Sequence, residues 1–359
     1  MSDPSIRLGE KIIMEGRSCY IIAEIGSNHN RNFETAKKLI DVAKENGCDV
    51  AKFQSYTADG IYSRYTPRIS EMEGRSYPDE TPYELIKRIE MPLEWHGPLK
   101  EYCDKVGITF CSTPFDESMV ELLENVHVPF YKVASYELTY YPLLAKIAQT
   151  GKPVILSTGN SEMDDIELAV KTLQENGCLD FALLHCVSQY PAAHDEIHLR
   201  CIQTLKNKFN CVVGFSDHTM DSLSSALAVS LGALIIEKHI TLDKTQFGPD
   251  HPFSLEPEEL KQFVKTLRKA ELILGTGEKK VRSGEEENHK MGRRSLVAAN
   301  DIQKGEEITR DKLVIKRPAL GLHPKYLNSI IGKRAVKDIH KDCWITQDSI
   351  MEFEYRDSG

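Results

Sequence analysis

The sequence predicts an α/β protein in which a (β/α)8, or TIM, barrel is followed by a small β-rich domain. Short apolar runs rich in Val, Ile and Phe alternate with longer segments of helical periodicity, which is typical of a parallel sheet built from repeated βα units. The run of alternating elements is long enough for about eight units, and a barrel needs roughly 250 residues. The chain of 359 residues therefore has room for a barrel and one further module.

The expected strands are short and the expected helices lie between or after them. The strands are predicted at residues 20–23, 50–53, 109–111, 130–134, 153–156, 181–184, 211–215 and 233–236. The clearest helices are predicted at residues 32–46, 93–106, 118–125, 163–174, 222–231 and 257–274. Gly47, Gly107, Gly177 and Gly232 follow predicted helices, where glycine commonly ends a helix. This pattern indicates that residues 1–275 form the barrel.

The composition changes after the last predicted helix. Residues 276–294 are rich in Lys, Glu, Arg and Gly and lack an apolar period, as expected of a solvated linker. Residues 295–359 contain short apolar stretches separated by turns, which indicates a compact β-rich domain. A module of about 60 residues without a disulfide framework buries little core by itself. We therefore expect it to pack against the barrel or another subunit.

Composition and charge argue against several classes of function. The formal net charge of −9, without a clustered basic face, argues against nucleic acid or an anionic membrane as the partner. The amino terminus lacks a signal-peptide pattern, and no apolar run approaches the ~18 residues of a membrane helix. The nine cysteines are scattered and form no CxxC pair, which fits a reducing compartment. We therefore expect a cytoplasmic protein in which local charges hold any anionic substrate.

Nearly every predicted strand ends in a polar or charged side chain. The carboxyl ends of barrel strands meet on one face, and such groups are costly to bury unless something pairs with them. The groups at or just after the strand ends are Glu24, Lys52, Gln54, Ser112, Thr113, Lys132, Ser135, Glu137, Ser157, Thr158, Ser188, Tyr190, His218 and His239. A pocket at the barrel mouth accounts for all of them.

Two histidines follow the seventh and eighth predicted strands. His218 and His239 would come from neighbouring strand ends, and two imidazoles placed there can bind one divalent ion while leaving positions open for water and substrate. Glu237 lies two residues before His239, so both side chains should point to the same side of the strand. A lysine inside an apolar strand, such as Lys52 or Lys132, is costly without an anion, which favours a binding site over a purely structural role.

These residues, in this order, resemble the sialic acid synthase family, whose members join phosphoenolpyruvate to an N-acylated hexose to make a nine-carbon sugar acid. The resemblance covers almost the whole chain. Its motifs in the barrel are residues 22–29 (IAEIGSNH), 52–54 (KFQ), 112–115 (STPF), 131–135 (YKVAS), 156–159 (LSTG), 216–219 (SDHT), 237–239 (EKH) and 248–251 (GPDH). The tail from Ser295 resembles the family's antifreeze-like (SAF) domain at residues 316–318 (KRP) and 331–333 (IGK).

The resemblance implies a role for each of these groups. His218 and His239 would hold Mn2+ or Mg2+, whose other positions take water and the aldehyde oxygen of the sugar. Glu24 and Glu137 would transfer protons, with acid and base unassigned. Phosphoenolpyruvate would bind to Lys52, Thr113, Lys132, Ser135, Ser157, Ser188 and Ser216. The sugar would bind to Gln54, Tyr190, Asp250 and Arg317. The resemblance also implies a homodimer in which the carboxy-terminal domain, with Arg317, is exchanged onto the partner barrel.

The sugar isomer stays open at this point. Residues 317–325 and Trp95 with His96 are similar to pseudaminic acid synthases, whereas residues 247–251 are similar to the sialic and legionaminic branch. Ser188 stands where some family members have Asn. Another phosphoenolpyruvate-dependent aldol-type synthase is the main alternative, since a fold alone does not set the reaction. A non-enzymatic carbohydrate-binding protein would leave the lysines and histidines unexplained.

Overall fold

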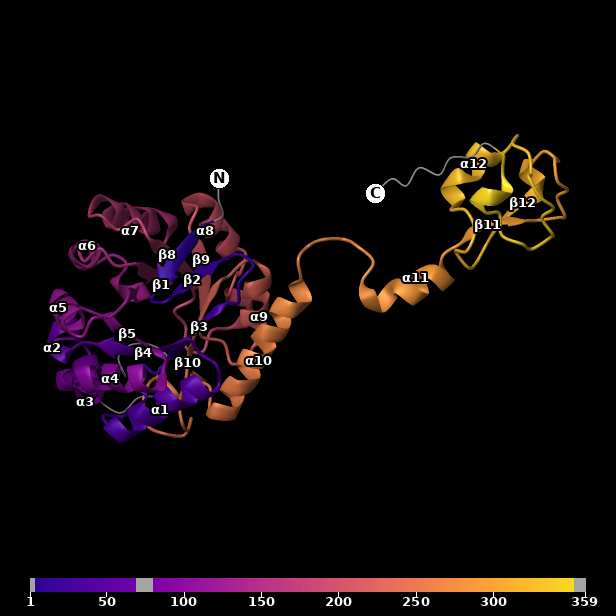
Figure 1. Cartoon of the computed structure of the whole chain (residues 1–359). Helices are drawn as coiled ribbons and strands as arrows, with labels where there is room; N and C mark the ends of the chain where they lie inside the picture. The colour runs from indigo at the N-terminus through magenta and orange to yellow at the C-terminus, as the bar shows by residue number, and fades with distance from the viewer. Residues whose placement is uncertain (1–3, 69–79, 352–359) are drawn as a thin grey trace. The chain divides into compact units, whose positions relative to one another are not determined.

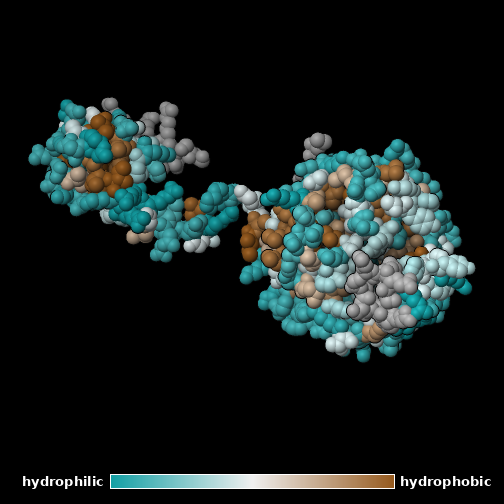
Figure 2. Space-filling view, turned by 180° about the vertical axis from the view of Figure 1, so that it is seen from behind, coloured by the Kyte–Doolittle hydropathy of each residue, from teal (hydrophilic) through white to brown (hydrophobic). Residues whose placement is uncertain are grey.

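The computed structural model describes residues 4–68 and 80–351 and divides the chain into two compact units. The first unit comprises Met1–Thr276, and the second comprises Gly277–Gly359. A barrel of strands surrounded by helices makes up the first unit, and a small domain of short elements belongs to the second (Figure 1). In the view of Figure 2 both units expose mainly hydrophilic residues. No helix among the described residues has the length and apolar character needed to cross a membrane.

The first unit is the predicted (β/α)8 barrel. Its eight-stranded sheet is parallel throughout, in the order β5-β4-β3-β10-β9-β8-β7-β6, and the end strands β5 and β6 lie beside each other, so the sheet closes almost completely. The strands are β3 (Tyr20–Glu24), β4 (Val50–Ser55), β5 (Thr109–Pro114), β6 (Tyr131–Val133), β7 (Val154–Ser157), β8 (Phe181–Cys186), β9 (Val212–Asp217) and β10 (Ile235–His239). All eight predicted strands are confirmed. Several run further toward the carboxyl end than predicted, because their polar residues remain in register with a neighbour, as His239 does with Glu24.

Helices cover the outside of the barrel. They are α1 (Phe33–Glu45), α2 (Ala58–Ile61), α3 (Pro82–Ile89), α4 (His96–Val106), α5 (Glu117–Asn125), α6 (Tyr141–Ala148), α7 (Met163–Glu175), α8 (Cys201–Phe209), α9 (Leu223–Ser230) and α10 (Pro257–Leu274). The six predicted helices are present, and the glycines after them have positive φ as expected. Helices α2, α3, α6 and α8 were not predicted. The start of α3 did carry a signal, a capping box between Thr81 and Glu84 with Pro82 in the first turn.

A β-hairpin that was not predicted closes the amino-terminal end of the barrel. Its strands are β1 (Ser5–Leu8) and β2 (Lys11–Met14), which pair antiparallel. The hairpin side chains Ile6, Leu8 and Ile13 pack in one cluster with residues at the starts of the barrel strands, such as Tyr20 and Ile235. This end of the barrel is therefore filled by apolar side chains, and only the carboxyl ends of the strands remain for a site.

The second unit is small and has a core of its own. Its sheet pairs β11 (Ser295–Ala298) with β12 (Leu313–Lys316) antiparallel, and its helices include α11 (Glu286–Gly292) and α12 (Leu327–Ile330). Leu296, Ile308, Ile330 and Ile345 are among its fully buried residues. The predicted linker is exposed, yet α11 forms within it. Ala335 forms an isolated antiparallel bridge with Ile350, and residues 352–359 lie outside the described residues.

Candidate active site

A cavity at the carboxyl ends of the barrel strands collects most of the predicted residues. Its volume is about 360 Å3, within the range of ligand pockets. The predicted residues in its lining are Glu24, Lys52, Gln54, Lys132, Ser135, Ser157, Tyr190, Ser216, His218, His239 and Asp250. They come from every part of the barrel sequence, so closure of the sheet is what brings them together.

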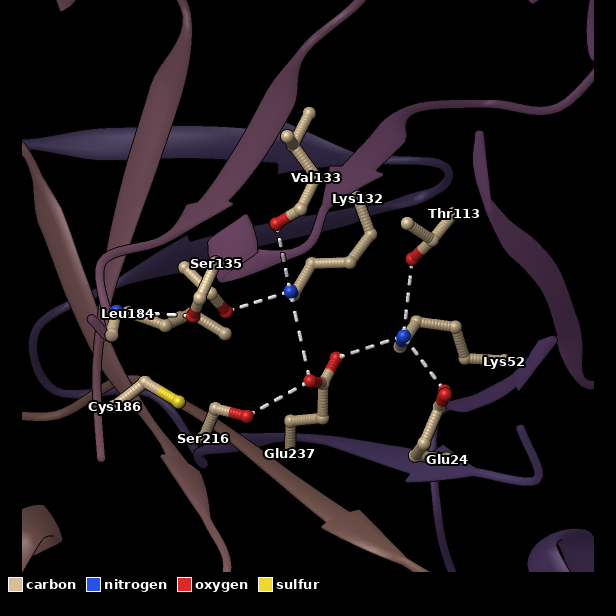
Figure 3. A network of polar contacts seen from close by, with 12 residues as sticks. Glu24, Lys52, Thr113, Lys132, Val133, Ser135, Leu184, Cys186, Ser216 and Glu237 are labelled. Atoms are coloured by element: carbon tan, nitrogen blue, oxygen red, sulfur yellow. Dashed lines mark hydrogen bonds and ion pairs between the residues drawn. The ribbon is translucent and has the colours of Figure 1, made fainter. Parts of the chain in front are cut away.

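Glu237 lies between the two buried lysines of this cavity (Figure 3). Its Oε1 atom accepts a hydrogen bond from Ser216 Oγ at 2.9 Å and lies 3.6 Å from Lys132 Nζ. Its Oε2 atom lies 3.6 Å from Lys52 Nζ. The sequence predicts that Glu237 shares a strand face with His239, but it does not indicate a role for Glu237. Its spacing of two residues from His239 was the signal that it faces the cavity. Its contacts with the lysines depend instead on how β4 and β6 pack relative to β10.

The two lysines are buried and have further partners. Lys52 Nζ lies 2.7 Å from Glu24 Oε2 and donates to Thr113 Oγ1 at 3.1 Å. Lys132 Nζ donates to Ser157 Oγ at 2.7 Å and to the carbonyl of Val133 at 3.0 Å. Their exposed fractions are 3% and 1%, so each ammonium depends on these neighbours instead of water.

The charges of this network shift one another's pKa values. Burial raises the pKa of Glu24 to about 7, although Lys52 opposes the shift. Burial lowers the pKa of Lys132, and the nearby Glu237 offsets only part of this effect. Burial would raise the pKa of Glu237, but Lys132 and Lys52 hold it below its ordinary value. Glu237 is therefore the carboxylate that stays ionised, and Glu24 is the one that titrates near neutral pH.

Gly26 leaves room for three predicted groups to meet. A Cβ atom at this position would lie 3.0 Å from Asp250 Oδ2, 3.3 Å from Gln54 Nε2 and 3.3 Å from Glu24 Oε1. The residue also has a φ of +52°, which favours glycine. Gln54 Nε2 donates to Glu24 Oε1 at 2.7 Å. These polar groups therefore converge on one side of the cavity.

His218 and His239 lie side by side, with ring centroids 5.5 Å apart. His218 Nδ1 lies 2.8 Å from the carbonyl of Val187, which favours the Nδ1–H tautomer and leaves the Nε2 lone pair available. His239 Nδ1 is buried without a hydrogen-bond partner, 3.7 Å from Asp250 Oδ2. Burial, together with His218, lowers the pKa of His239 well below its ordinary value, so its imidazole is neutral. This donor pair suits a divalent ion.

Within the described residues, no group of three or more His, Cys, Asp or Glu residues is placed to hold a metal. An ion between the two imidazoles would therefore need water or substrate for its other ligands. This arrangement resembles catalytic metal sites, which keep positions open, more than structural sites, which are closed by protein ligands.

Three predicted barrel residues lie beside the cavity rather than in its lining. Thr113 accepts a hydrogen bond from Lys52 at 3.1 Å. Ser188 Oγ is buried without a hydrogen-bond partner, close to Gly159, whose added Cβ would lie 2.5 Å from it. Glu137 lies on the 3-10 helix η3 (Ser135–Glu137), and burial raises the pKa of its carboxyl to about 8. Arg317 is an exposed residue of the second unit.

Comparison with known proteins decides the family. The NeuB family model matches residues 39–279, two thirds of the chain, and the SAF domain model matches residues 293–351. This chain belongs to the NeuB family. The match confirms the resemblance to sialic acid synthases, and the predicted barrel with a carboxy-terminal SAF domain is confirmed as well.

Relatives of this NeuB-family chain are synthases of related sugar acids. The chain is 41% identical over 324 residues to N,N'-diacetyllegionaminic acid synthase of Campylobacter jejuni, covering 90% of this chain and 97% of the relative. It is 36% identical over 332 residues to pseudaminic acid synthase of Helicobacter pylori, covering 92% and 97%. A crystal structure of N-acetylneuraminic acid (sialic acid) synthetase from Leptospira borgpetersenii in complex with citrate matches with a TM-score of 0.70 and 35% identity, over 80% of this chain and 95% of that one.

The NeuB-family cavity also has an apolar wall that was not predicted. Ile86 and Ile89 lie one turn apart on α3 and form this wall together with Phe115. Phe115 packs edge-on against Tyr56, another lining residue, at 5.3 Å between ring centroids. Ile86 and Ile89 could not be placed in the cavity from the sequence, because α3 was not predicted. The cavity thus combines a charged end, at the lysines, with an apolar wall.

Proposed function

We propose that this NeuB-family protein is a nonulosonic acid synthase. It condenses phosphoenolpyruvate with an open-chain N-acylated hexose, giving a nine-carbon 2-keto sugar acid and phosphate. The observation that carries the proposal is the placement of two buried lysines and two histidines in one cavity. The synthase names of the relatives support it.

The lysines and serines form the binding site for phosphoenolpyruvate in this proposal. Lys52 and Lys132 offset the phosphate and carboxylate charges, and charge-assisted hydrogen bonds are roughly twice as strong as neutral ones. Ser135, Ser157 and Ser216 supply hydroxyl donors in the same cavity. Glu237 keeps both ammonium groups paired, 3.6 Å from each, until the anion enters. An acidic protein can thus bind a trianion through local charge.

His218 and His239 would hold Mn2+ or Mg2+, and when bound the ion would polarise the aldehyde oxygen of the acceptor. Gln54, Tyr190 and Asp250 line the same cavity and would orient the sugar hydroxyls. Holding both substrates in one cavity converts a bimolecular step into an intramolecular one, which lowers its entropic cost. The residues that bind the two substrates would thus orient the enol carbon of phosphoenolpyruvate toward the aldehyde carbon of the sugar.

The reaction needs one carbon–carbon bond and one molecule of water. The enol carbon of phosphoenolpyruvate attacks the aldehyde carbon, water adds to the resulting cationic carbon, and the tetrahedral intermediate expels phosphate. Proton transfer accompanies the water addition and the alkoxide formation. Glu24 and Glu137, with pKa values of about 7 and about 8, suit proton transfer near neutral pH.

The acceptor that we propose is a 2,4-diacetamido-trideoxyhexose, although N-acetylmannosamine belongs to the same class. Ile86, Ile89 and Phe115 form an apolar wall, which suits the methyl end of a 6-deoxy sugar better than a hydroxymethyl group. The 41% identity to a legionaminic acid synthase supports this choice.

We also propose a cytoplasmic homodimer in which the SAF domain is exchanged, so that Arg317 reaches the acylamino group of the sugar in the partner barrel. All nine cysteines are free, as suits a reducing compartment, and Arg317 is exposed. Mixing an Arg317→Ala protein with a His239→Ala protein tests the exchange. Regained activity would support exchanged dimers, and none would favour a site within one chain.

The deciding experiment is an assay of the purified protein with Mn2+ and phosphoenolpyruvate. Phosphate release and product mass are measured separately with N-acetylmannosamine, with the 2,4-diacetamido-trideoxymannose sugar and with its altrose-configured isomer. We expect release with at least one of them. No release with any of these three acceptors would overturn the proposal. A parallel assay with a phosphorylated sugar tests the alternative, because release only there would support another aldol-type synthase.

A further inference from the structure

A second buried ion pair lies directly behind the two histidines. Lys238 precedes His239 in β10, Asp217 precedes His218 at the end of β9, and the two charged residues are in register across these neighbouring strands. Successive side chains of a strand point to opposite faces. Because Glu237 and His239 line the cavity, Lys238 points the other way, toward the surrounding helices. Its Nζ atom lies 5.8 Å from the ring centre of a phenylalanine of α10.

The pair ties the turn after β9 to strand β10. Lys238 Nζ lies 3.2 Å from Asp217 Oδ2 and also donates to the carbonyl oxygen of Thr219. Asp217 Oδ1 accepts from the backbone N and the Oγ1 of Thr219, at 2.8 and 2.7 Å. Asp217 Oδ2 accepts from Ser225 Oγ at 2.6 Å. Thr219 directly follows His218, so these contacts hold the backbone that carries His218 against the strand that carries His239.

Stability alone does not explain a pair of charges at this place. The side chains of Lys238 and Asp217 are 1% and 0% exposed, and most buried positions of the barrel strands are apolar. Replacing a buried ion pair by apolar residues of similar volume is often neutral or stabilising, because the charges lose their hydration. The ion pair instead fixes the relative position of β9 and β10, because its hydrogen bonds join defined atoms of the two strands.

The other side of His218 is held by the loop that follows strand β8. Its ring Nδ1 lies 2.8 Å from the carbonyl of Val187, and its own carbonyl accepts from the backbone N of Ala192 at 3.0 Å. The ring is therefore anchored toward the loop after β8. The following turn is anchored toward β10 by the Asp217–Lys238 pair and by the bond from Lys238 to the carbonyl of Thr219.

We propose that Asp217 and Lys238 are positioning residues that set the separation of His218 and His239, and thereby the affinity of the site for a divalent ion. The inference rests on the proposed function, because it assumes that the two histidines hold the ion. Groups that orient metal ligands from outside the site typically change metal affinity 10- to 100-fold when mutated.

The test measures Mn2+ binding directly, from the electron paramagnetic resonance signal of free Mn2+ during titration of the full-length protein. We expect Lys238→Met to weaken Mn2+ binding at least tenfold. Phosphoenolpyruvate affinity, measured by calorimetry without metal, should stay unchanged. The double variant Asp217→Asn with Lys238→Met removes both charges, so it avoids leaving an unpaired buried carboxylate and serves if the single variant fails to fold.

The matched control is Arg268→Met. Arg268 pairs with Glu271 at 2.8 Å and donates to the carbonyl of Cys19 near the start of β3, at the opposite end of the barrel. Losing this pair should leave the Mn2+ affinity unchanged. Circular dichroism and thermal unfolding establish that each variant is folded.

The outcomes separate this proposal from the proposed function. Mn2+ binding that disappears in His239→Ala but is unchanged in both pair variants would overturn the positioning role alone. Absence of Mn2+ binding by the unmodified protein, or full binding by His239→Ala, would overturn the metal site and this inference with it. Equal weakening in Arg268→Met would also overturn the inference, since it would mean that general destabilisation explains the loss.

Discussion

The carboxylate of Glu237 lies 3.6 Å from the ammonium group of Lys132 inside the barrel, and both residues are at least 95% buried. Each charge is costly in this environment without the other. Lys132 has Ser157 and a backbone carbonyl as its other partners, both of them uncharged. Glu237 is thus the residue that makes a buried lysine tolerable before any anion binds.

The first prediction concerns the stability of this pair. Lys132→Met should lower the free energy of unfolding by about 3 kcal/mol, because the buried carboxylate of Glu237 loses one of its two lysine partners. Adding Glu237→Gln should restore most of that loss. Urea denaturation followed by circular dichroism measures both values. A double variant that is no more stable than the single one would show that the two charges are not coupled.

The same double variant makes a second prediction, about ligand binding. Removing Lys132 removes an ammonium group from the proposed phosphoenolpyruvate site, so its dissociation constant should rise at least tenfold, which is about 1.4 kcal/mol. Glu237→Gln should not repair this defect, even where it repairs stability. Calorimetric titration with phosphoenolpyruvate gives the values. A defect limited to the sugar acceptor would contradict the assignment of Lys132.

The third prediction is a pH dependence of stability that originates from Glu137. Its folded pKa is raised by burial from 4.5 to about 8, and one of its carboxyl oxygens has no hydrogen-bond partner. Between these pH values the folded protein binds a proton that the unfolded chain has released. The free energy of unfolding should therefore fall as the pH rises from about 5 to 8. The slope should be about 1.4 kcal/mol per pH unit, which is the value for one bound proton.

Glu137→Gln should remove this part of the pH dependence, because glutamine resembles the protonated carboxyl. The variant should match the unmodified protein near pH 5 and exceed its stability near pH 8. The exposed Glu94 provides a control variant, Glu94→Gln, which should leave the slope unchanged. Equal slopes in the Glu137→Gln and unmodified proteins would show that this carboxyl is ionised in the folded state.

The fourth prediction concerns the metal. Chelation by EDTA should abolish condensation, and Mn2+ should restore it in the unmodified protein but not in His239→Ala. Phosphoenolpyruvate should still bind to that variant, since Lys52 and Lys132 are unaffected. Phosphate release and calorimetry measure the two properties. Full activity after exhaustive chelation would rule out a metal-dependent reaction.

The fifth prediction concerns the apolar wall on α3. Ile86→Ala should lower kcat/KM for the 2,4-diacetamido-trideoxy acceptor about tenfold, because lost apolar contacts in a pocket are worth roughly 1–3 kcal/mol. The same change should affect N-acetylmannosamine less, since its hydroxymethyl end gains little from the wall. Competition between the two sugars, followed by mass spectrometry, gives the ratio. An equal loss for both would assign Ile86 a structural role.

Periodicity, the polar groups at strand ends and the family motifs were enough to predict the order of the barrel elements and eleven residues of the cavity lining. Periodicity is a local property, so α10 could be placed at its exact bounds, Pro257–Leu274, without knowledge of its neighbours. The polar groups at strand ends could be grouped as well. A parallel barrel brings the carboxyl ends of all its strands to one face. Lys52 and His239 therefore share a cavity, whatever the precise packing of the helices around them.

Which of these groups touch depends on the packing of segments that are distant in the sequence. Glu237 meets Lys52 and Lys132 because β10 lies opposite β6 in the closed sheet and β4 lies midway between them, so their inward side chains converge. The sequence holds no measure of these distances. The hairpin β1–β2 and the wall from α3 likewise depend on packing between distant segments. Local propensity selects a helix or a strand, but contact between remote residues follows from how the closed sheet arranges them.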